Sequence, residues 1–448
     1  MTQPLDALTS RLLDHALKAG ADAADALAVE ESAVSVDVLG GRLEHAERAE
    51  GTDIGLRVFV GRRQAVVSAS DTRPETMAEM AARAIAMARE APEDPSAGLA
   101  DPAQLAVNRG AAALDLCDPA KDPPPAALEQ DALRAEAAAL AVPGVSQVES
   151  AGASSGRSRF HLAATNGFSG GYARSHRALY CVAITGEGTG MERDYRSDAR
   201  VFGADLDSPE DIGRIAGERA AARAGARKPP TGRFPVLFDE RIARSLTGHL
   251  LAAVNGGAIA RGASWLRDAL GQQVLPAHLS LTEDPHRARV SGSRPFDAEG
   301  LPTKQRNIVA DGVLTGWVLD LATARRLGFD STGNAARGTS GVPSPAVTNI
   351  ALTQGGQSRA DLIRDMGEGL LVTSLIGATI NPNTGDYSRG ASGFWVEGGE
   401  IAWPVNECTI AGNLRDMLLE IVPANDARGH VGHVVPSLLV GGMTLAGA

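Results

Sequence analysis

The 448-residue chain is poor in the residue types that build disulfide frameworks, nucleic-acid surfaces and membrane spans. Its three cysteines, Cys117, Cys181 and Cys408, contain no C-x-x-C pair, which excludes a disulfide scaffold and suits a reducing cytosol. A formal net charge of -11 argues against a broad phosphate-binding surface, and 4% aromatic residues offer few platforms for stacking bases. No run approaches the roughly 18 apolar residues of a membrane span, and the N-terminus lacks a signal-peptide pattern. These absences predict a cytoplasmic protein that binds neither membranes nor nucleic acid.

The hydrophobic pattern of the first half predicts helices packed against antiparallel strands. Leu5, Leu8 and Leu12 keep helical spacing in a first helix that ends near Gly20. Alternating apolar residues then predict an antiparallel meander with turns at 40–41 and 61–62. Further helices are predicted from Pro74 onward, over 125–141 and over 208–224. The helix that Pro74 opens has an apolar face made of Met77, Met80, Ala81, Ala84, Met87 and Ala88.

Prolines, a glycine and charged residues at 226–236 mark the best domain boundary. They predict an N-terminal α+β domain over 1–228, with a Pro-rich surface connection at 92–128, and a C-terminal domain over 229–448. The second domain opens with a strand and a helix and continues as short β segments, with a hairpin signal at 311–312. Bunched strands with few helices predict the α+β class, with a curved, barrel-like antiparallel sheet in the C-terminal domain.

The stretch 241–266 predicts a helix that stops in a glycine turn, and His249, its one histidine, has no partner for metal binding within that helix. A helical metallopeptidase site needs two imidazoles on nearby turns and a carboxylate beside them. Ser245 and Ala253 stand four residues before and after His249, and Leu250 follows it. A place at the edge of the core-facing stripe is therefore favoured, and this helix predicts no zinc site of its own.

Two other candidate motifs are incomplete. His430 and His433 form H-x-x-H, but residues three apart on a strand face opposite sides, so two loop histidines are favoured over a metal pair. Ser154 lies in the pattern G-x-S-x-G, which forms a nucleophile elbow when a helix follows it. A strand is predicted after Ser154, so a role as nucleophile is not expected.

The tetrapeptide R-G-x-S occurs three times, beginning at Arg261, Arg337 and Arg389. Turn chemistry explains the pattern, because glycine allows a positive φ and serine can bond back to the backbone. The alternative is that the three arginines converge on one cavity. The pattern gives no direction for the side chains, so both interpretations stay open.

The block TGDYSRGASGFWVE at 384–397 is long and unusual in composition. It resembles the C-terminal region of the TldD/PmbA family, in particular its TldE (PmbA) subunit type. The loop GNAARGTSGVPSPAVTNIAL at 333–352 is similar to the family's loop before its last sheet. The N-terminal helix and meander, the proline boundary and the closing VVPSLLVGGMTLAG also fit, so the resemblance covers essentially the whole chain.

The TldD subunits of this family carry a His-Glu-x-x-x-His motif and a late cysteine that hold zinc, and this chain departs from both. With Gly262 of RGAS as the anchor, the motif positions fall on Thr247, Gly248, His249, Leu250, Leu251 and Ala252. The region of the late cysteine reads DARGHVGHVVPS, without Cys. The resemblance therefore implies a TldE-type subunit with no catalytic residue and no metal ligand of its own, in which these six positions are a vacated motif.

By resemblance, the chain is the partner of a TldD-type catalytic subunit that holds the zinc of a cytoplasmic, heteromeric metalloprotease. Family tasks include leader removal from peptide-antibiotic precursors and turnover of antitoxins, so unfolded peptides are the implied substrates. We expect this chain to line a channel for extended peptide. The candidates for channel or interface contacts are Asp386, Tyr387, Arg389, Arg261, Arg337 and Asn334. Local turn structure is the alternative role of these side chains, and a homodimer in the partner's absence is left open.

Two other functions stay open at this point. The chain could be a hydrolase with an unusual metal site of its own, with His249, His430, His433 and Cys408 as donors. It could also be a non-enzymatic interaction protein of the toxin–antitoxin or gyrase-modulator kind, which the family's older label reflects. Zinc content of the isolated chain separates the first alternative from the subunit, and the identity of the co-purifying protein separates the second.

Overall fold

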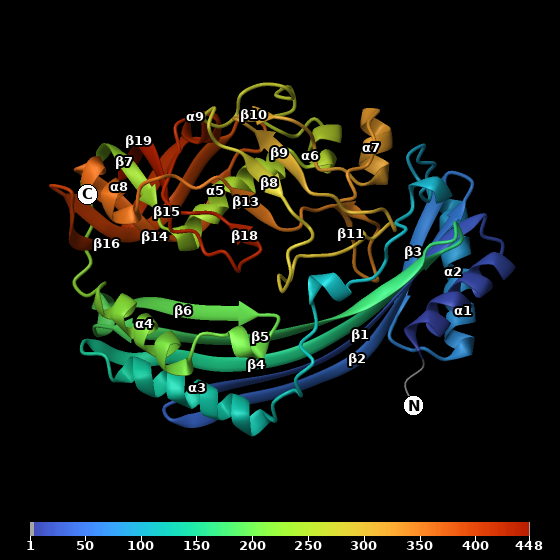
Figure 1. Cartoon of the computed structure of the whole chain (residues 1–448), viewed down its shortest axis with the longest axis horizontal. Coiled ribbons are helices and arrows are strands. Elements are labelled where there is room, and N and C mark those ends of the chain that lie inside the picture. The colour runs from blue at the N-terminus through green and yellow to red at the C-terminus, as the bar shows by residue number, and fades with distance from the viewer. Residues whose placement is uncertain (1–3, 448) are drawn as a thin grey trace.

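The computed structural model describes residues 4–447, which form two halves that face each other (Figure 1). A curved sheet of six strands in the order β3-β2-β1-β4-β5-β6 builds the N-terminal half, and all neighbours run antiparallel. These strands are β1 (Ala23–Leu39), β2 (Arg42–Val60), β3 (Arg63–Ala69), β4 (Val145–Ala164), β5 (Ser169–Thr185) and β6 (Glu192–Arg200). At about 3.3 Å per residue, the 20 residues of β4 extend over roughly 65 Å, so one sheet reaches across the molecule.

Two helix pairs cover this sheet, each over a patch of apolar strand residues. α1 (Leu5–Lys18) and α2 (Pro74–Glu90) pack at the end formed by β1, β2 and β3 (Figure 1). α3 (Pro125–Leu140) and α4 (Pro209–Ala221) pack toward the other end, against β4, β5 and β6. Gly40 and Gly41, with φ of 62° and 72°, form the left-handed turn that joins β1 to β2.

The C-terminal half is built on a small closed barrel. Its strands follow one another in the order β16-β15-β14-β7-β19, and β19 pairs again with β16, which closes the ring. They are β7 (Gly232–Phe238), β14 (Gly369–Ile380), β15 (Asp386–Glu397), β16 (Glu400–Asn413) and β19 (Leu438–Ala446). β7 runs parallel to β14, whereas the other barrel neighbours are antiparallel. Helix α5 (Glu240–Ala253) shares one apolar cluster with the barrel.

A second sheet and several short elements complete this half. The sheet has the order β10-β9-β8-β13-β18, in which β13 and β18 run parallel. Its strands are β8 (Leu281–Glu283), β9 (Arg306–Ala310), β10 (Val313–Leu314), β13 (Ile350–Leu352) and β18 (His433–Val434). The remaining elements are α6 (Gly256–Ala260), α7 (Leu321–Leu327), β11 (Ala335–Ala336), β12 (Ser344–Pro345), α8 (Arg359–Met366), α9 (Leu414–Leu419) and β17 (Val422–Pro423). Between residues 4 and 447, no helix has the length and apolar character to cross a membrane.

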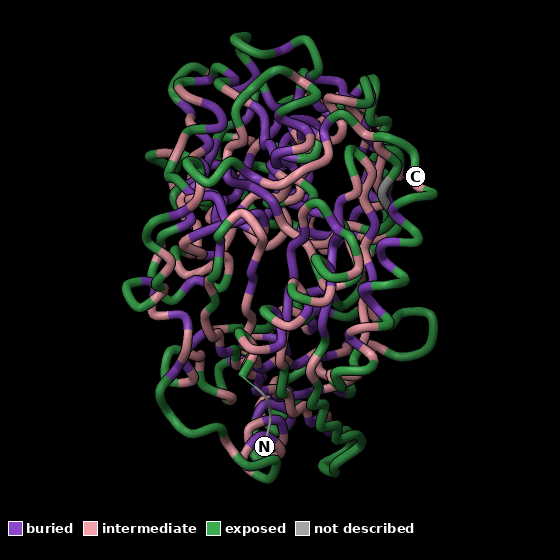
Figure 2. The backbone as a smooth tube through the Cα atoms, turned by 90° about the vertical axis from the view of Figure 1, so that its right-hand side faces the viewer, coloured by how far each residue is buried: buried purple, intermediate pink, exposed green. Residues whose placement is uncertain are grey.

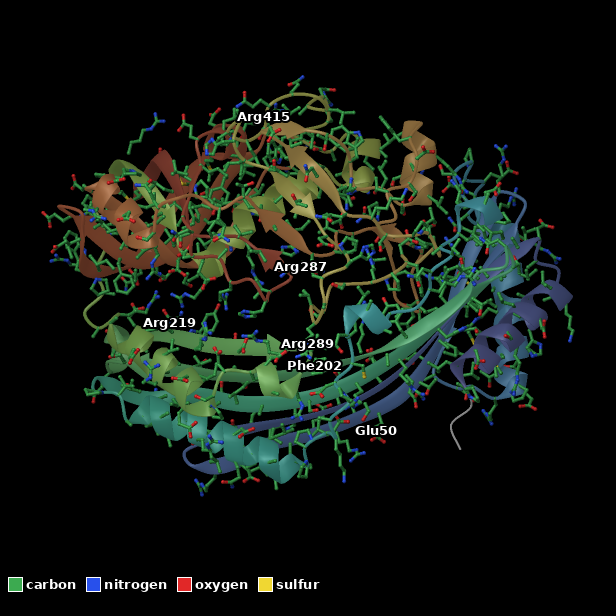
Figure 3. The ribbon with its side chains drawn as sticks, in the orientation of Figure 1. Glu50, Phe202, Arg219, Arg287, Arg289 and Arg415 are labelled. Atoms are coloured by element: carbon green, nitrogen blue, oxygen red, sulfur yellow. The ribbon has the colours of Figure 1, made fainter. Side chains whose placement is uncertain are left out.

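The two halves share a buried interface. Phe296 of the C-terminal half packs edge-on against Phe168 and Phe160 of the N-terminal half, with ring centroids 4.9 and 6.2 Å apart. The guanidinium of Arg289 lies 3.9 Å from the ring centroid of Phe202, across the boundary between the halves (Figure 3). Buried segments run through the interior of both halves, and the exposed ones lie mainly on loops at the periphery (Figure 2). The interface therefore fixes how the sheet faces the barrel.

The structure confirms the predicted α+β class, the first helices, the early hairpins and the barrel-like sheet of the C-terminal domain. One face assignment is wrong: Met87 is 48% exposed, and Ile85 takes its place in the buried face of α2. The reason is helical phase, because Ala84, Ile85 and Ala88 continue the i, i+3, i+4 series that Met87 leaves. The connection at 92–128 is also less superficial than predicted. Two short 3-10 turns lie in it, at 102–104 and 112–114, and residues such as Leu116 are buried.

Candidate functional site

Helix α5 buries one side and leaves the other free to line a cavity. The carboxylate of Asp239 accepts a hydrogen bond from the backbone N–H of Arg241 at 3.1 Å, which caps the start of the helix. Ala243, Leu246 and Leu250 follow at helical spacing and are buried in the cluster shared with the barrel. Arg244, Ser245 and Gly248 lie on another side of the helix.

A cavity of about 680 Å³ lies along that polar side of α5. β14, β15 and the segment 428–435 form its other walls, and Tyr195 of β6 contributes from the N-terminal sheet. Its volume lies within the roughly 300–1,000 Å³ of small-ligand sites. The residues around it are Tyr195, Glu240, Arg241, Ile242, Arg244, Ser245, Gly248, Thr373, Ser374, Leu375, Arg389, Arg428, Val431, Gly432, His433 and Val435. We call it the α5 cavity.

Arg287 holds the segment 428–435 against the rest of the half. Its guanidinium donates to the carbonyl oxygen of Val431 at 3.0 Å and to that of Gly429. Figure 3 shows Arg287 on the side of the C-terminal half that faces the sheet. A half-buried guanidinium bonded to backbone therefore positions the segment that carries His433.

The α5 cavity is strongly cationic, although the chain carries a net charge of -11. Four arginines and one glutamate line it. Arg241 is neutralised by Asp194 at 2.7 Å, and Arg428 is neutralised by Glu240 at 2.8 Å. The other two arginines create the excess positive charge.

These two are Arg244 and Arg389, which have no carboxylate within ion-pair distance in the described part of the chain, residues 4–447. The Nε of Arg389 donates to the carbonyl oxygen of Gly377 at 2.7 Å. Burial lowers the pKa of His433, and the charge of Arg244 lowers it further. Burial and the charge of Arg389 lower the pKa of His249 in the same way. Both imidazoles are therefore neutral at pH 7, and the guanidiniums set the charge of the cavity.

The six positions of the vacated motif fall on different sides of α5. Thr247 is buried, and its hydroxyl donates to the carbonyl oxygen of Arg244 at 3.0 Å. Leu250 and Leu251 are buried in the core, and Ala252 is exposed. Gly248 is the member of the six that lines the cavity, and it brings no side chain there.

His249 packs beside the barrel, as its place at the edge of the apolar stripe predicts. Its ring meets that of Tyr387 edge-on, with centroids 5.8 Å apart. Its Nε2 and the hydroxyl of Tyr387 are buried and have no hydrogen-bond partner among residues 4–447. Burial raises the pKa of Tyr387 to about 12, so the phenol stays protonated.

The donors around the α5 cavity do not fit a zinc ion. A catalytic zinc takes three protein ligands of the nitrogen, sulfur or oxygen type. The cavity offers the imidazole of His433 and the carboxylate of Glu240, and that carboxylate is already bonded to Arg428. Arg244 and Arg389 would repel a dication in the same space. Across residues 4–447, no three His, Cys, Asp or Glu side chains gather as a metal-binding group.

The alternative metal donors lie apart from one another. His430 faces Asp198 of β6, with 3.5 Å between Nε2 and the carboxylate oxygen. Cys408 is buried in the barrel, and its thiol donates to the carbonyl oxygen of Ala391 at 3.2 Å. Ser154 lies in the middle of β4, so the predicted strand after it is confirmed.

The predicted site residues on β15 have different roles: one stabilises a turn, and another lines the α5 cavity. Asp386 is exposed and accepts hydrogen bonds from the hydroxyl of Thr384 at 2.6 Å and the amide of Asn413 at 3.1 Å, so it stabilises the turn before β15. Tyr387 and Arg389 share one face of the strand, because residues two apart point the same way. Arg389 reaches the α5 cavity, and Tyr387 lies behind it against His249.

The three arginines of the R-G-x-S pattern do not converge. Arg261 is exposed at the end of α6, and Arg389 lines the α5 cavity. Arg337 is buried at the interface between the halves, 2.5 Å from Asp25, where it lines a different cavity of about 260 Å³. Asn334 is buried, and its amide donates to a carboxylate oxygen of Glu283 at 2.8 Å. Convergence on one cavity was the alternative interpretation, and it is wrong.

Arg244 and Ser245 are cavity residues that the sequence reasoning did not single out. Helical spacing contains part of the signal, because Arg244 and Gly248 are four residues apart and share a face. Helical spacing cannot predict which residues form the opposite wall of the cavity. Arg389 of β15 and His433 of β18 form part of that wall, although they lie more than a hundred residues after Arg244 in the sequence.

Comparison with known proteins assigns the chain to a family. Residues 24–88, 118–224 and 231–447 match the first, central and C-terminal domains of the PmbA/TldA metallopeptidases. The Escherichia coli O157:H7 metalloprotease PmbA is 36% identical over 95% of this chain and 92% of its own length. A crystal structure from Bacteroides thetaiotaomicron is 27% identical, with a TM-score of 0.88 over 99% of this chain and 98% of the other. The crystal structure of TldE from Thermococcus kodakarensis is 20% identical and shares the fold, with a TM-score of 0.84 over 98% of this chain and 99% of that one. The chain therefore belongs to the PmbA/TldD metallopeptidase family.

Proposed function

We propose that this chain is the non-catalytic, TldE-type subunit of a TldD/TldE zinc metalloprotease. The observation that carries the proposal is the chemistry of α5. Positions 247, 248 and 252 hold Thr, Gly and Ala, and the cavity beside the helix is lined by Arg244 and Arg389. A site for a metal-bound water needs neutral or anionic donors, and guanidiniums cannot serve as ligands.

In this proposal the zinc and the hydrolytic step belong to a TldD-type partner subunit. The contribution of this chain is shape and charge: the curved sheet, the barrel and the cationic cavity between them enclose and orient a peptide. The fold shared with TldE and the names of the metalloprotease relatives support the proposal. The enclosed sites suit short, unfolded chains, so leader peptides of antibiotic precursors and antitoxins are the proposed substrates. The three cysteines are free, which supports a cytoplasmic location.

Reconstitution of peptidase activity tests the proposal. The chain is purified alone and together with the His-Glu-x-x-x-His subunit of the same organism, and cleavage of an unstructured 20-residue peptide is followed by mass spectrometry. We expect no cleavage by this chain alone and cleavage by the pair. As a control, replacement of the motif glutamate in the catalytic subunit by glutamine should abolish cleavage by the pair.

Cleavage by the isolated chain that is lost in His249→Ala or His433→Ala would contradict the proposal. It would favour a hydrolase with its own metal site, which the names of the metalloprotease relatives also allow. Failure of a TldD-type subunit to bind, with another protein co-purifying instead, would favour an interaction protein.

A further inference from the structure

The α5 cavity holds two positive charges that the described part of the chain does not balance. Arg241 and Arg428 are paired with carboxylates, whereas Arg244 and Arg389 face the same space without one. Arg244 is exposed and Arg389 is half-buried, and two like charges that share one space repel each other unless an anion lies between them. The excess charge points to an anionic occupant.

Neutral hydrogen-bonding groups complete the lining. The hydroxyl of Ser245 is buried and has no hydrogen-bond partner within residues 4–447. His433 is neutral because burial and Arg244 lower its pKa, so one ring nitrogen can donate. The bond from Nε of Arg389 to Gly377 fixes that guanidinium and leaves its terminal amino groups for another acceptor. Each group offers a donor to an oxygen anion.

The surroundings favour a carboxylate over a phosphate. Phosphate sites draw on free backbone N–H groups at a helix start. At α5 the side chain of Asp239 already accepts from the N–H of Arg241, and Glu240 places a negative charge in the first turn. What remains is guanidinium groups, whose planar forks bind either anion, so the lack of free helix N–H groups is what favours the carboxylate.

The segment 428–435 and β6 make the cavity large enough for more than a small ion. At about 680 Å³, it accommodates several atoms beyond a carboxylate group. Tyr195, Ile242, Leu375 and Val435 add apolar contact area around the charged centre. A ligand that carries a short organic chain beside its anionic group fits this combination of charged and apolar surroundings.

We propose that the α5 cavity binds a carboxylate group of a peptide, held by Arg244 and Arg389 with Ser245 and His433 as further donors. The group is either the C-terminal carboxylate or an aspartate or glutamate side chain. The inference deepens the proposed function, because the ligand is a part of the substrate class named there. Binding is measured on the isolated chain, so its outcome is independent of whether a catalytic subunit is found.

Calorimetry with three peptides on the full-length chain tests the proposal. The first is acetyl-Ala-Gly-Ala-Gly-Ala with a free carboxylate, the second is its C-terminal amide, and the third is that amide with the central Ala replaced by Asp. We expect at least one acidic peptide to bind at least about tenfold tighter than the neutral amide, since charge-assisted hydrogen bonds discriminate by such factors. Tight binding of the first alone identifies a C-terminal carboxylate, and tight binding of the third identifies a side chain.

Substitutions locate the binding in the cavity. Arg244→Gln and Arg389→Gln should each weaken the acidic peptide by about tenfold or more and leave the neutral amide unchanged. Arg389→Lys should retain part of the affinity, and thermal melting shows that each variant is folded. The matched control is Arg267→Gln, which removes an exposed arginine paired with Asp268 outside the cavity. Three results would overturn the proposal. The acidic and neutral peptides bind with equal affinity, none of the peptides binds, or the folded arginine variants bind like the native chain.

Discussion

Asp25 of β1 shows how a buried charge holds the two halves together. Its carboxylate lies 2.5 Å from Arg57 of the neighbouring strand and 2.5 Å from Arg337 of the C-terminal half. Burial alone would raise the pKa of Asp25, but the charges of Arg337 and Arg57 outweigh it and hold the pKa below 3.8. The stabilisation is therefore present above about pH 4 and is lost as pH falls toward the folded-state pKa.

Asp25→Asn should lower the free energy of unfolding at pH 7 by about 3–5 kcal/mol, because it leaves two buried guanidiniums without a counter-charge. Urea denaturation measures the change. Asp268→Asn is the control, since Asp268 is exposed and pairs with a neighbouring side chain. An effect of Asp25→Asn as small as that of the control would refute the role assigned to this ion pair.

Glu299 carries the opposite pKa shift. Burial, and then the nearby charge of Asp297, raise the pKa of Glu299 to about 8. The folded chain therefore keeps a proton that the unfolded chain loses near pH 4.5, and this group's contribution to stability falls as pH rises from about 4.5 to 8. Glu299→Gln should remove that loss, so its stability relative to the native chain should increase with pH over this window. Urea denaturation at pH 5 to 8 tests this, with exposed Glu400→Gln as control; a difference independent of pH would contradict it.

At the scale of elements, two helical glycines have opposite surroundings: one faces open space and the other lies in a tight contact between helices. A Cβ on Gly248 of α5 would meet no atom within 4 Å, whereas one on Gly213 of α4 would lie 1.9 Å from the carbonyl oxygen of Ala135 in α3. Gly248→Ala should stabilise the chain by about 0.5–1 kcal/mol through helix propensity. Gly213→Ala should destabilise it by about 1–3 kcal/mol, because the two helices must separate. Thermal melts of both variants compare them, and equal shifts would show that α3 and α4 are not packed as described.

Local signals in the sequence predict the helices and the hairpins. They do not predict which distant strands pair with one another. α1, α2, α3 and α4 follow from apolar spacing and proline starts, and the early hairpin from Gly40 and Gly41. The pairing of β1 with β4 joins strands more than a hundred residues apart, and the closure of β16 on β19 has no turn signal. Pairing of this kind depends on faces formed only after folding.

The same limit applies to the candidate site. Arg389 and Tyr387 could be named because they stand in an unusual sequence block, whereas Arg244 stands in an ordinary helical pattern. The α5 cavity brings Arg244 and His433 together from positions almost two hundred residues apart. The positive charge of the α5 cavity therefore could not be predicted from the sequence and is recognised only in the folded structure.

At the scale of the whole molecule, the two halves form one unit, and residues of both halves line the α5 cavity. The aromatic contacts of Phe296 and the Asp25 ion pairs cross the interface, and Tyr195 of the N-terminal sheet reaches the α5 cavity. In the proposed assembly, this unit contributes an enclosing, cationic surface, and the catalytic subunit contributes the metal. On that proposal, this chain alone is not sufficient for peptide hydrolysis.

Zinc content of the isolated full-length chain tests this account most directly. The chain is incubated with zinc, dialysed and measured by mass spectrometry of the metal, with His249→Ala and His433→Ala beside it. The account predicts far less than one zinc per chain, unchanged in both variants, since guanidiniums line the α5 cavity and Thr247, Gly248 and Ala252 of the helix offer no metal ligand. One zinc retained per chain, and lost in either variant, would contradict it.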